Sequence, residues 1–130
     1  MEQRRVSAER VAQVWADGDF DGLVGFSQGG ALAAHVVRQG LVTPRFCVFF
    51  SSYAGLKPSP HTSSSTLPWL NTTSSLHVWG SNDQVVRPAF SRALCESMRG
   101  SAHCIDDTGH AIPPAPFAET VVADWLQGLV

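Results

Sequence analysis

Three side-chain types that together perform nucleophilic catalysis stand at separate places in the sequence. A serine lies between glycines in the stretch Gly25-Phe26-Ser27-Gln28-Gly29, which fits the G-x-S-x-G pattern of a nucleophile elbow. An aspartate, Asp83, occurs in GSNDQVV, and a histidine, His110, occurs in DDTGHAIPP. A serine hydroxyl attacks a carbonyl only when a base takes its proton, and the base needs an acid that fixes its tautomer. The three residues would therefore support acyl transfer through a covalent serine intermediate.

These side chains need elements that bring them together, and the hydrophobic pattern predicts helices that alternate with strands. We expect helices at 6–17, 28–39, 87–98 and 114–129, and strands at 23–26, 45–51, 76–80 and 102–106. This alternation predicts an α/β fold, with a parallel sheet and helices on both faces. The length of 130 residues suits a single domain over 1–130.

The three candidate residues each follow a predicted strand. In open α/β sheets the chemistry lies at the carboxyl ends of the strands, so Ser27, Asp83 and His110 are expected at one edge. Their order along the chain is the order found in α/β-hydrolases. The elbow is a strained turn, which predicts that Gly25 and Gly29 are small because space is short. The backbone N–H of Gln28, at the start of the next helix, is expected to bind an oxyanion.

Histidines other than His110 fit the role of the base less well. His35 lies inside a predicted helix and His77 inside a predicted strand, so both are expected to be structural. His103 comes early in its strand, at the wrong end. His61 lies in a long loop, and its position alone leaves it open as an alternative.

Asp83 follows a strand that ends in Gly80, and its alternative role is to cap the next turn or helix. Asp106 and Asp107 are rival acids because they are close to His110 in sequence. Neighbours on one short loop rarely have room to fold back with the right geometry, so Asp83 is favoured.

The stretch from Tyr53 to Ser75 is rich in serine, threonine and proline and is long for a loop. Loops of this length are commonly functional or disordered. Its larger side chains could line one side of an acyl pocket or could equally pack in the core: Tyr53, Leu67, Trp69 and Leu70.

Composition limits the other functions. A net charge of −2 gives no electrostatic footprint for nucleic acid, and no apolar stretch reaches the length of a stable membrane span. The charged start lacks the apolar core of a secretory signal, so we expect a cytoplasmic protein. Three cysteines without a C-x-x-C pair predict neither disulfides nor a metal site, and Cys47 and Cys104 are expected in the core.

Three blocks of the sequence, GFSQGGALAA, LHVWGSNDQVVRP and DTGHAIPP, carry a family resemblance. The chain resembles the serine hydrolase family that includes the fungal family-of-serine-hydrolases proteins and the ovarian cancer-associated serine hydrolase, within the α/β-hydrolases. The resemblance covers most of the chain from Asp21 onward. It implies Ser27 as nucleophile, Asp83 as acid and His110 as base. It also implies hydrolysis of small-molecule carboxylic esters without a cofactor, and in some relatives a preference for long alkyl chains.

The sequence departs from the family pattern at its N-terminus. Family members have an additional N-terminal part, in which a strand ends in a His-Gly motif. The loop after that strand supplies a second oxyanion donor and a wall of the pocket. We therefore expect the C-terminal part of the usual fold, without its N-terminal strands. The strand before Ser27 then becomes a sheet edge that could pair in a homodimer, and turnover is expected to be slow.

Two further functional classes stay open on the sequence. A thioesterase or a small peptidase would use the same three groups as an esterase. Alternatively, the chain is a catalytically impaired α/β-hydrolase fragment that acts as an association module. A binding module of the response-regulator type is disfavoured, since it would need an acidic cluster where GLVGF leads into the serine turn.

Overall fold

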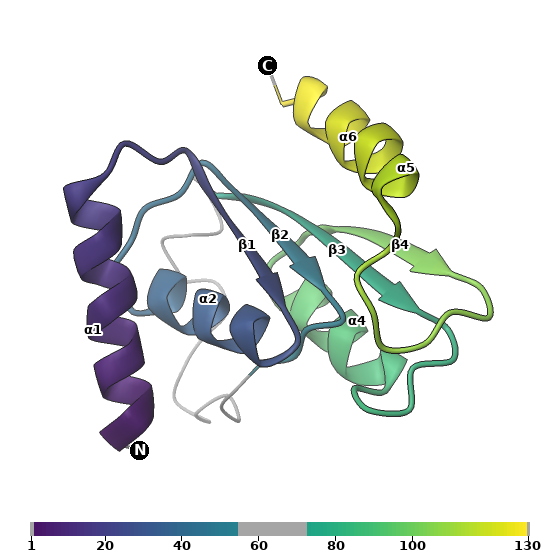
Figure 1. Ribbon diagram of the computed structural model, residues 1–130, viewed down its shortest axis with the longest axis horizontal. Helices are drawn as coiled ribbons and strands as arrows, with labels where there is room; N and C mark the ends of the chain where they lie inside the picture. Colours follow the sequence, from purple (N-terminus) through teal and green to yellow (C-terminus); the bar gives the residue numbers. More distant parts are fainter. Residues whose placement is uncertain (1, 55–72, 130) are drawn as a thin grey trace.

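The fold is built on one sheet of four parallel strands in the order β1-β2-β3-β4 (Figure 1). The computed structural model describes residues 2–54 and 73–129. The strands are β1 (Gly22–Phe26), β2 (Phe46–Phe50), β3 (Ser74–Gly80) and β4 (Ser101–Ile105). Because neighbouring strands are parallel, the connections through α2 and α4 each cross over one face of the sheet.

The register brings the carboxyl ends of the strands to one edge. Phe26 is level with Phe50, and Phe50 is level with Val78. Gly80, the last residue of β3, is level with Ile105, the last residue of β4. The residues that follow β1, β3 and β4 therefore meet at this edge, as the sequence predicts.

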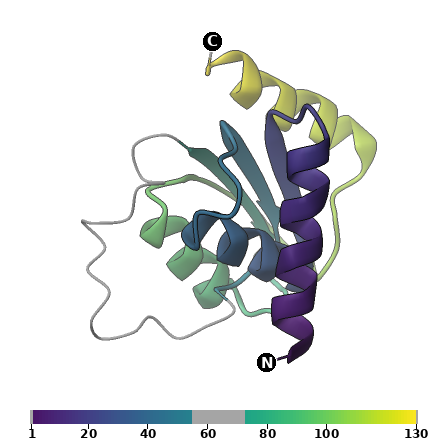
Figure 2. The same ribbon diagram turned by 90° about the vertical axis from the view of Figure 1, so that its left-hand side faces the viewer.

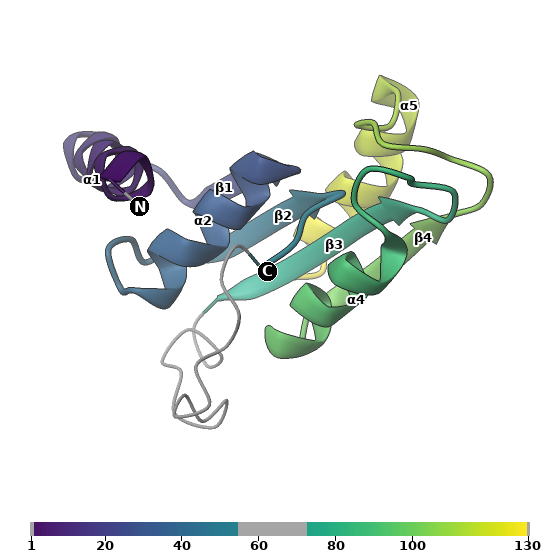
Figure 3. The same ribbon diagram turned by 90° about the horizontal axis from the view of Figure 1, so that it is seen from below.

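Helices cover both faces of the sheet, which confirms the predicted architecture. One face carries α2 (Gln28–Arg38) and α4 (Pro88–Ser97), and α1 (Glu2–Asp17) packs beside α2 on the β1 side (Figures 2 and 3). The other face carries α5 (Ala115–Phe117), a π-helical segment η2 (Ala118–Val122) and α6 (Ala123–Gln127).

Two apolar cores hold these layers together. On the α2 side, Cys47 and Phe49 of β2 pack against small and branched residues of the helices, including Ala33, Val36 and Leu94. On the opposite face, Val48 and Phe50 belong to a cluster with Leu76 and Val78, against which Phe117, Val122 and Trp125 pack. The alternation of β2 between the two clusters explains why its sequence has no polar positions.

The final helix differs from the single helix predicted at 114–129. It is interrupted over Ala118–Val122, where the backbone is π-helical. The hydroxyl of Thr120 donates to the carbonyls of Pro116 and Phe117, at 2.6 and 3.2 Å. Such back-bonding competes with regular helical hydrogen bonds, and hydrophobic spacing does not report it. At the other end of the chain, α1 begins at Glu2, four residues before the predicted start.

The prediction for Cys104 is wrong, because this thiol is exposed, whereas Cys47 is buried as expected. Burial raises the pKa of Cys47 to about 12. Cys104 lies in β4, the last strand of the sheet, and α4 packs mainly against β3. An apolar run on an edge strand therefore does not imply that both of its faces are covered.

Strand β1 forms the opposite edge of the sheet. Within residues 2–54 and 73–129 it pairs only with β2. Val24, in its middle, is 67% exposed. This agrees with the expectation that the strand before the serine turn lies at an edge.

Candidate active site

Ser27 is the single residue between β1 and α2. Its φ angle is +54°, a left-handed conformation that is strained for a residue with a side chain. Its N–H donates to the carbonyl of Phe50 at 2.9 Å, and its own carbonyl accepts from the N–H groups of Gly30 and Ala31. These three bonds tie the strained residue to the neighbouring strand and to the first turn of α2.

The crowding around the turn is only partly as predicted. A Cβ on Gly25 would lie 2.5 Å from the Cα of Gly30, and a Cβ on Gly30 would collide with the side chain of Ser52. A Cβ on Gly29 would meet nothing within 4 Å. The close approach of strand to helix therefore depends on Gly25 and Gly30, and the prediction of crowding at Gly29 is wrong.

Asp83 lies in the loop after β3, with its side chain fully buried. One carboxylate oxygen accepts from the N–H groups of Val85 and Val86, both at 2.9 Å. The other faces the Nδ1 atom of His110 at 2.8 Å. Burial raises the pKa of Asp83, but the hydrogen bonds and the charge of His110 outweigh it, so this pKa lies below its ordinary value. Asp83 is thus both the turn cap and the partner of His110.

Several backbone contacts join the Asp83 loop to the His110 loop. The N–H groups of Ser81 and Asn82 donate to the carbonyls of Ile105 and Thr108, at 2.8 and 3.0 Å. The hydroxyl of Ser81 accepts from the N–H of Asp107. Gly80 permits this approach, because a Cβ there would collide with the Thr108 carbonyl. The two loops therefore behave as one unit that holds the acid and the imidazole in place.

His110 completes a chain of hydrogen-bonding partners. Its Nε2 atom lies 3.0 Å from the Oγ of Ser27, while its Nδ1 atom faces Asp83. Its side chain is 17% exposed. The ring also packs on Phe26, with the ring centres 4.9 Å apart. The sequence pattern does not single out Phe26, and its only signal there is the position directly before Ser27.

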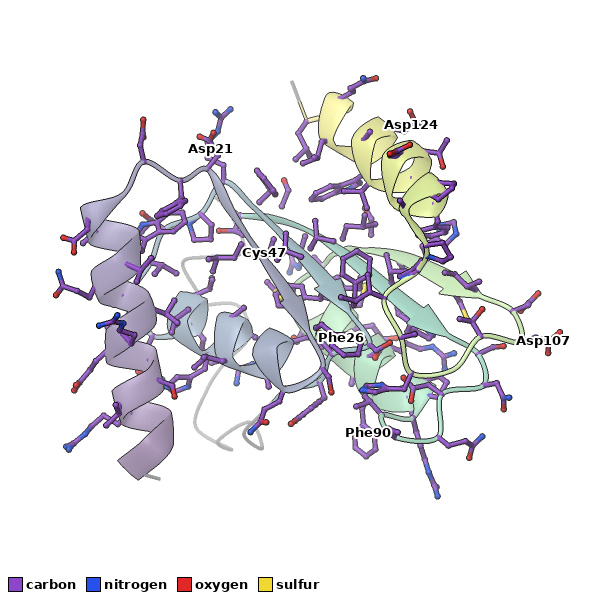
Figure 4. All side chains as sticks on the ribbon, in the orientation of Figure 1. Asp21, Phe26, Cys47, Phe90, Asp107 and Asp124 are labelled. Atoms are coloured by element: carbon purple, nitrogen blue, oxygen red, sulfur yellow. The ribbon has the colours of Figure 1, made fainter. Side chains whose placement is uncertain are left out.

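The competing residues lie elsewhere. His77 is buried inside β3 and His103 packs edge-on against Phe117, while His35 lies in α2. Asp106 and Asp107 are exposed on the loop after β4. In Figure 4, Asp107 lies at the tip of that loop, well away from Phe26. Among the described residues, the hydrogen-bonding partners of the His110 side chain are the two predicted from the sequence, Ser27 and Asp83, and His61 lies outside the described residues.

Of the remaining predicted site residues, the structure describes Gln28 and Tyr53. Gln28 is the first residue of α2, so its backbone N–H has no acceptor within the helix and is available beside Ser27. Tyr53 is half-buried, three residues beyond β2. Leu67, Trp69 and Leu70 lie outside the described residues. No helix within the described part of the chain is long and apolar enough to span a membrane.

The arrangement can move a proton from a hydroxyl to an imidazole that a buried carboxylate orients. That is the chemistry of acyl transfer. A parallel sheet with a serine turn after one strand, an acid after another and a histidine after a third defines an α/β-hydrolase.

Comparison with known proteins agrees with this class. The family model described as serine hydrolase (FSH1) matches residues 2–120, and the chain belongs to that family. It is 39% identical over 118 residues to mouse esterase OVCA2, covering 85% of this chain and 50% of the mouse protein. It is 29% identical over 125 residues to family of serine hydrolases 3 from Saccharomyces cerevisiae, covering 89% and 47% of the two chains. The chain thus spans about half the length of these curated relatives.

Solved structures share the fold. An α/β hydrolase from the metagenome of lagoon sediments superimposes with a TM-score of 0.73 at 20% identity, covering 96% of this chain and 70% of that one. A Zea mays acyl-protein thioesterase 2 gives a TM-score of 0.67 at 20% identity, covering 98% and 65%. At this identity the likeness establishes the fold alone.

Proposed function

We propose that the chain is a serine hydrolase that cleaves small-molecule carboxylic esters through an acyl-enzyme intermediate. Ser27 is the nucleophile, His110 the general base and Asp83 the acid that orients it. The observation that carries the proposal is the continuous contact from the Oγ of Ser27 through the His110 ring to Asp83, at 3.0 and 2.8 Å. Membership of the serine hydrolase family supports it.

The first half of the reaction forms the acyl-enzyme. The Oγ of Ser27 bonds to the ester carbonyl carbon while its proton passes to Nε2 of His110. Asp83 accepts from Nδ1 and stabilises the imidazolium that results. The oxyanion of the tetrahedral intermediate accepts a hydrogen bond from the N–H of Gln28. The intermediate collapses, the carbon–oxygen bond to the alcohol breaks, and His110 returns its proton to the departing oxygen.

The second half releases the acid. Water gives a proton to His110 and adds to the acyl carbon, forming a second tetrahedral intermediate. Its collapse breaks the bond to Oγ, and His110 protonates Ser27. No metal or cofactor has a role in these steps.

Two further expectations belong to the proposal. We expect Tyr53, with Leu67, Trp69 and Leu70, to line one side of the acyl pocket. We also expect the protein in the cytoplasm.

A substrate panel tests the leaving group. The purified chain is offered oxygen esters, thioesters and amides that share one acyl group, beside Ser27→Ala as the control. We expect hydrolysis of the oxygen esters that Ser27→Ala abolishes. Faster turnover of the thioesters would favour a thioesterase, and activity on amides alone would contradict the proposal.

A second candidate function, association through the sheet edge, is favoured by β1. Its sequence, Gly22–Phe26, has neither charge nor proline to discourage pairing, and Val24 is 67% exposed. In that case the chain would form a homodimer along β1 and its serine would be inert. Sedimentation of the chain beside Val24→Lys separates the two: an inert dimer that the lysine dissociates favours association, and an active monomer favours the enzyme.

A further inference from the structure

Phe26 is the last residue of β1 and directly precedes Ser27. Alternation along the strand points Gly25 toward α2, where it meets Gly30, so the Phe26 side chain lies on the opposite face. There it packs against the cluster that contains Phe50. Figure 4 labels Phe26 near the carboxyl end of β1. Its ring is therefore anchored by the sheet core on one side and meets His110 on the other.

The two hydrogen bonds of His110 do not fix its ring completely. They hold the imidazole at two atoms, Nδ1 facing Asp83 and Nε2 facing Ser27, and a straight line joins these two partner atoms. A ring held only at these two ends can still tilt about that line. The Phe26 ring, with its centre 4.9 Å from that of the imidazole and an interplanar angle of 35°, is in contact with the imidazole and opposes this tilt.

The same contact stabilises the charged form of His110 that arises during the reaction. His110 becomes an imidazolium when it takes the proton of Ser27. A cation within about 6 Å of an aromatic ring centre is attracted by the ring face, more strongly where water is excluded. With its side chain 17% exposed, His110 is largely screened from water. The contact with Phe26 is then stronger in the transition state than before the reaction begins.

We propose that Phe26 is a positioning residue, whose ring holds the His110 imidazole in the orientation that lets it face Ser27 and Asp83 at once. This inference rests on the proposed function, because it assigns Phe26 a part in the same reaction. It predicts that an aromatic ring is required at position 26, beyond an apolar side chain of similar size.

The first test reads the imidazole directly, with histidine-labelled protein and NMR. The Nδ1 proton of His110 is assigned by its loss in His110→Asn. We expect a resolved signal in the wild-type chain and in Phe26→Tyr, and a signal broadened by exchange in Phe26→Leu. Phe26→Met, which differs in shape but stays apolar, should behave as Phe26→Leu and replaces it if that variant does not fold.

The chain offers a matched control. Phe49 packs on His77 as Phe26 packs on His110, with ring centres 4.8 Å apart. Phe49→Leu removes an equivalent ring from a histidine that lies outside the candidate site. It should lower stability and leave the His110 signal unchanged.

The second test is the rate at which a fluorophosphonate labels Ser27. Phe26→Leu should label about tenfold more slowly than the wild type, and Phe26→Tyr and Phe49→Leu at close to the wild-type rate. A folded Phe26→Leu with an unchanged Nδ1 signal and labelling rate would overturn the inference, as would Phe26→Tyr impaired as much as Phe26→Leu. If Ser27→Ala is labelled like the wild type, the proposed function fails, while the NMR comparison still decides the role of Phe26.

Discussion

Two histidines of this chain have nearly the same immediate neighbours. The Nε2 atom of His110 lies 3.0 Å from the hydroxyl of Ser27, and that of His77 lies 2.9 Å from the hydroxyl of Ser75. Each ring packs on a phenylalanine, at 4.9 and 4.8 Å between centres. A serine, a histidine and an aromatic ring in contact therefore do not by themselves define a catalytic site.

The two histidines differ in the partner of the Nδ1 atom and in their exposure to solvent. The Nδ1 atom of His110 faces the carboxylate of Asp83, whereas that of His77 is buried without a hydrogen-bond partner among the described residues. His77 is 1% exposed, and burial lowers its pKa to about 4. His77 therefore resists protonation, while His110 has an acid ready to stabilise its charge. The positions of the two histidines in the fold explain the contrast. His77 lies within β3, inside the core, whereas His110 follows β4 at the carboxyl edge of the sheet.

Removing the carboxylate that distinguishes His110 from His77 should have the largest effect, a loss of kcat. Asp83→Asn keeps the shape but cannot stabilise the imidazolium, and it favours the wrong tautomer of His110. The same change in a serine protease triad lowers kcat by about 10⁴-fold, and we expect a loss of that order in ester hydrolysis. Retention of more than a tenth of wild-type kcat in a folded Asp83→Asn chain would put the acid elsewhere.

His77 should control stability against pH without affecting turnover. In the unfolded chain a histidine has its ordinary pKa, 6.5, whereas the pKa of folded His77 is about 4. Between these values the unfolded chain binds more protons, so stability is complete above pH 6.5 and falls as the pH drops toward 4. The loss is on the order of 3 kcal/mol.

His77→Gln tests this, since glutamine cannot titrate and can still bond Ser75. Its free energy of unfolding, measured with denaturant at several pH values, should fall less than that of the wild type between pH 6.5 and 4. Equal slopes for the two chains would show that His77 is not the group responsible.

Gly80→Ala should disturb the site without touching any of its three residues. The new methyl group meets the carbonyl of Thr108 and pushes the His110 loop away from the Asp83 loop. Overpacking of this kind costs about 1–3 kcal/mol of stability, and hydrolysis should fall with it. Gly29→Ala is the matched control, because a Cβ there meets nothing within 4 Å. If both variants behave alike, the tight approach at Gly80 has no effect on the site.

Ser75→Ala should have the smallest effect. It removes the bond to His77 inside the core and leaves a second imidazole nitrogen without a partner, at a cost of about 1–3 kcal/mol in unfolding free energy. Ester hydrolysis by the folded variant should equal that of the wild type. A marked fall in kcat would mean that the buried pair takes part in the reaction.

Much of the architecture follows from sequence patterns because those patterns are local. Strands and helices alternate with clear hydrophobic periodicity, and recognisable residues mark the ends of elements: β3 ends at Gly80 and α4 begins at Pro88. The three candidate residues could be found since each directly follows a strand, and parallel strands bring their carboxyl ends together.

The features that the sequence did not predict depend on contacts between distant segments. Cys104 is exposed because α4 packs mainly against β3, and the close neighbour of Gly25 is Gly30 in the first turn of α2. The contact of Phe26 with His110 joins residues 84 positions apart. The spacing of residues along the chain does not predict such long-range contacts.

The central claim is that Ser27, and not Ser75, is the activated serine. Its most direct test is labelling with a fluorophosphonate probe of the wild-type chain, Ser27→Ala and Ser75→Ala, each shown to be folded by circular dichroism. We predict labelling of the wild type and of Ser75→Ala, and none of Ser27→Ala. Labelling that survives in Ser27→Ala, or a folded wild-type chain that does not react at all, would contradict the account.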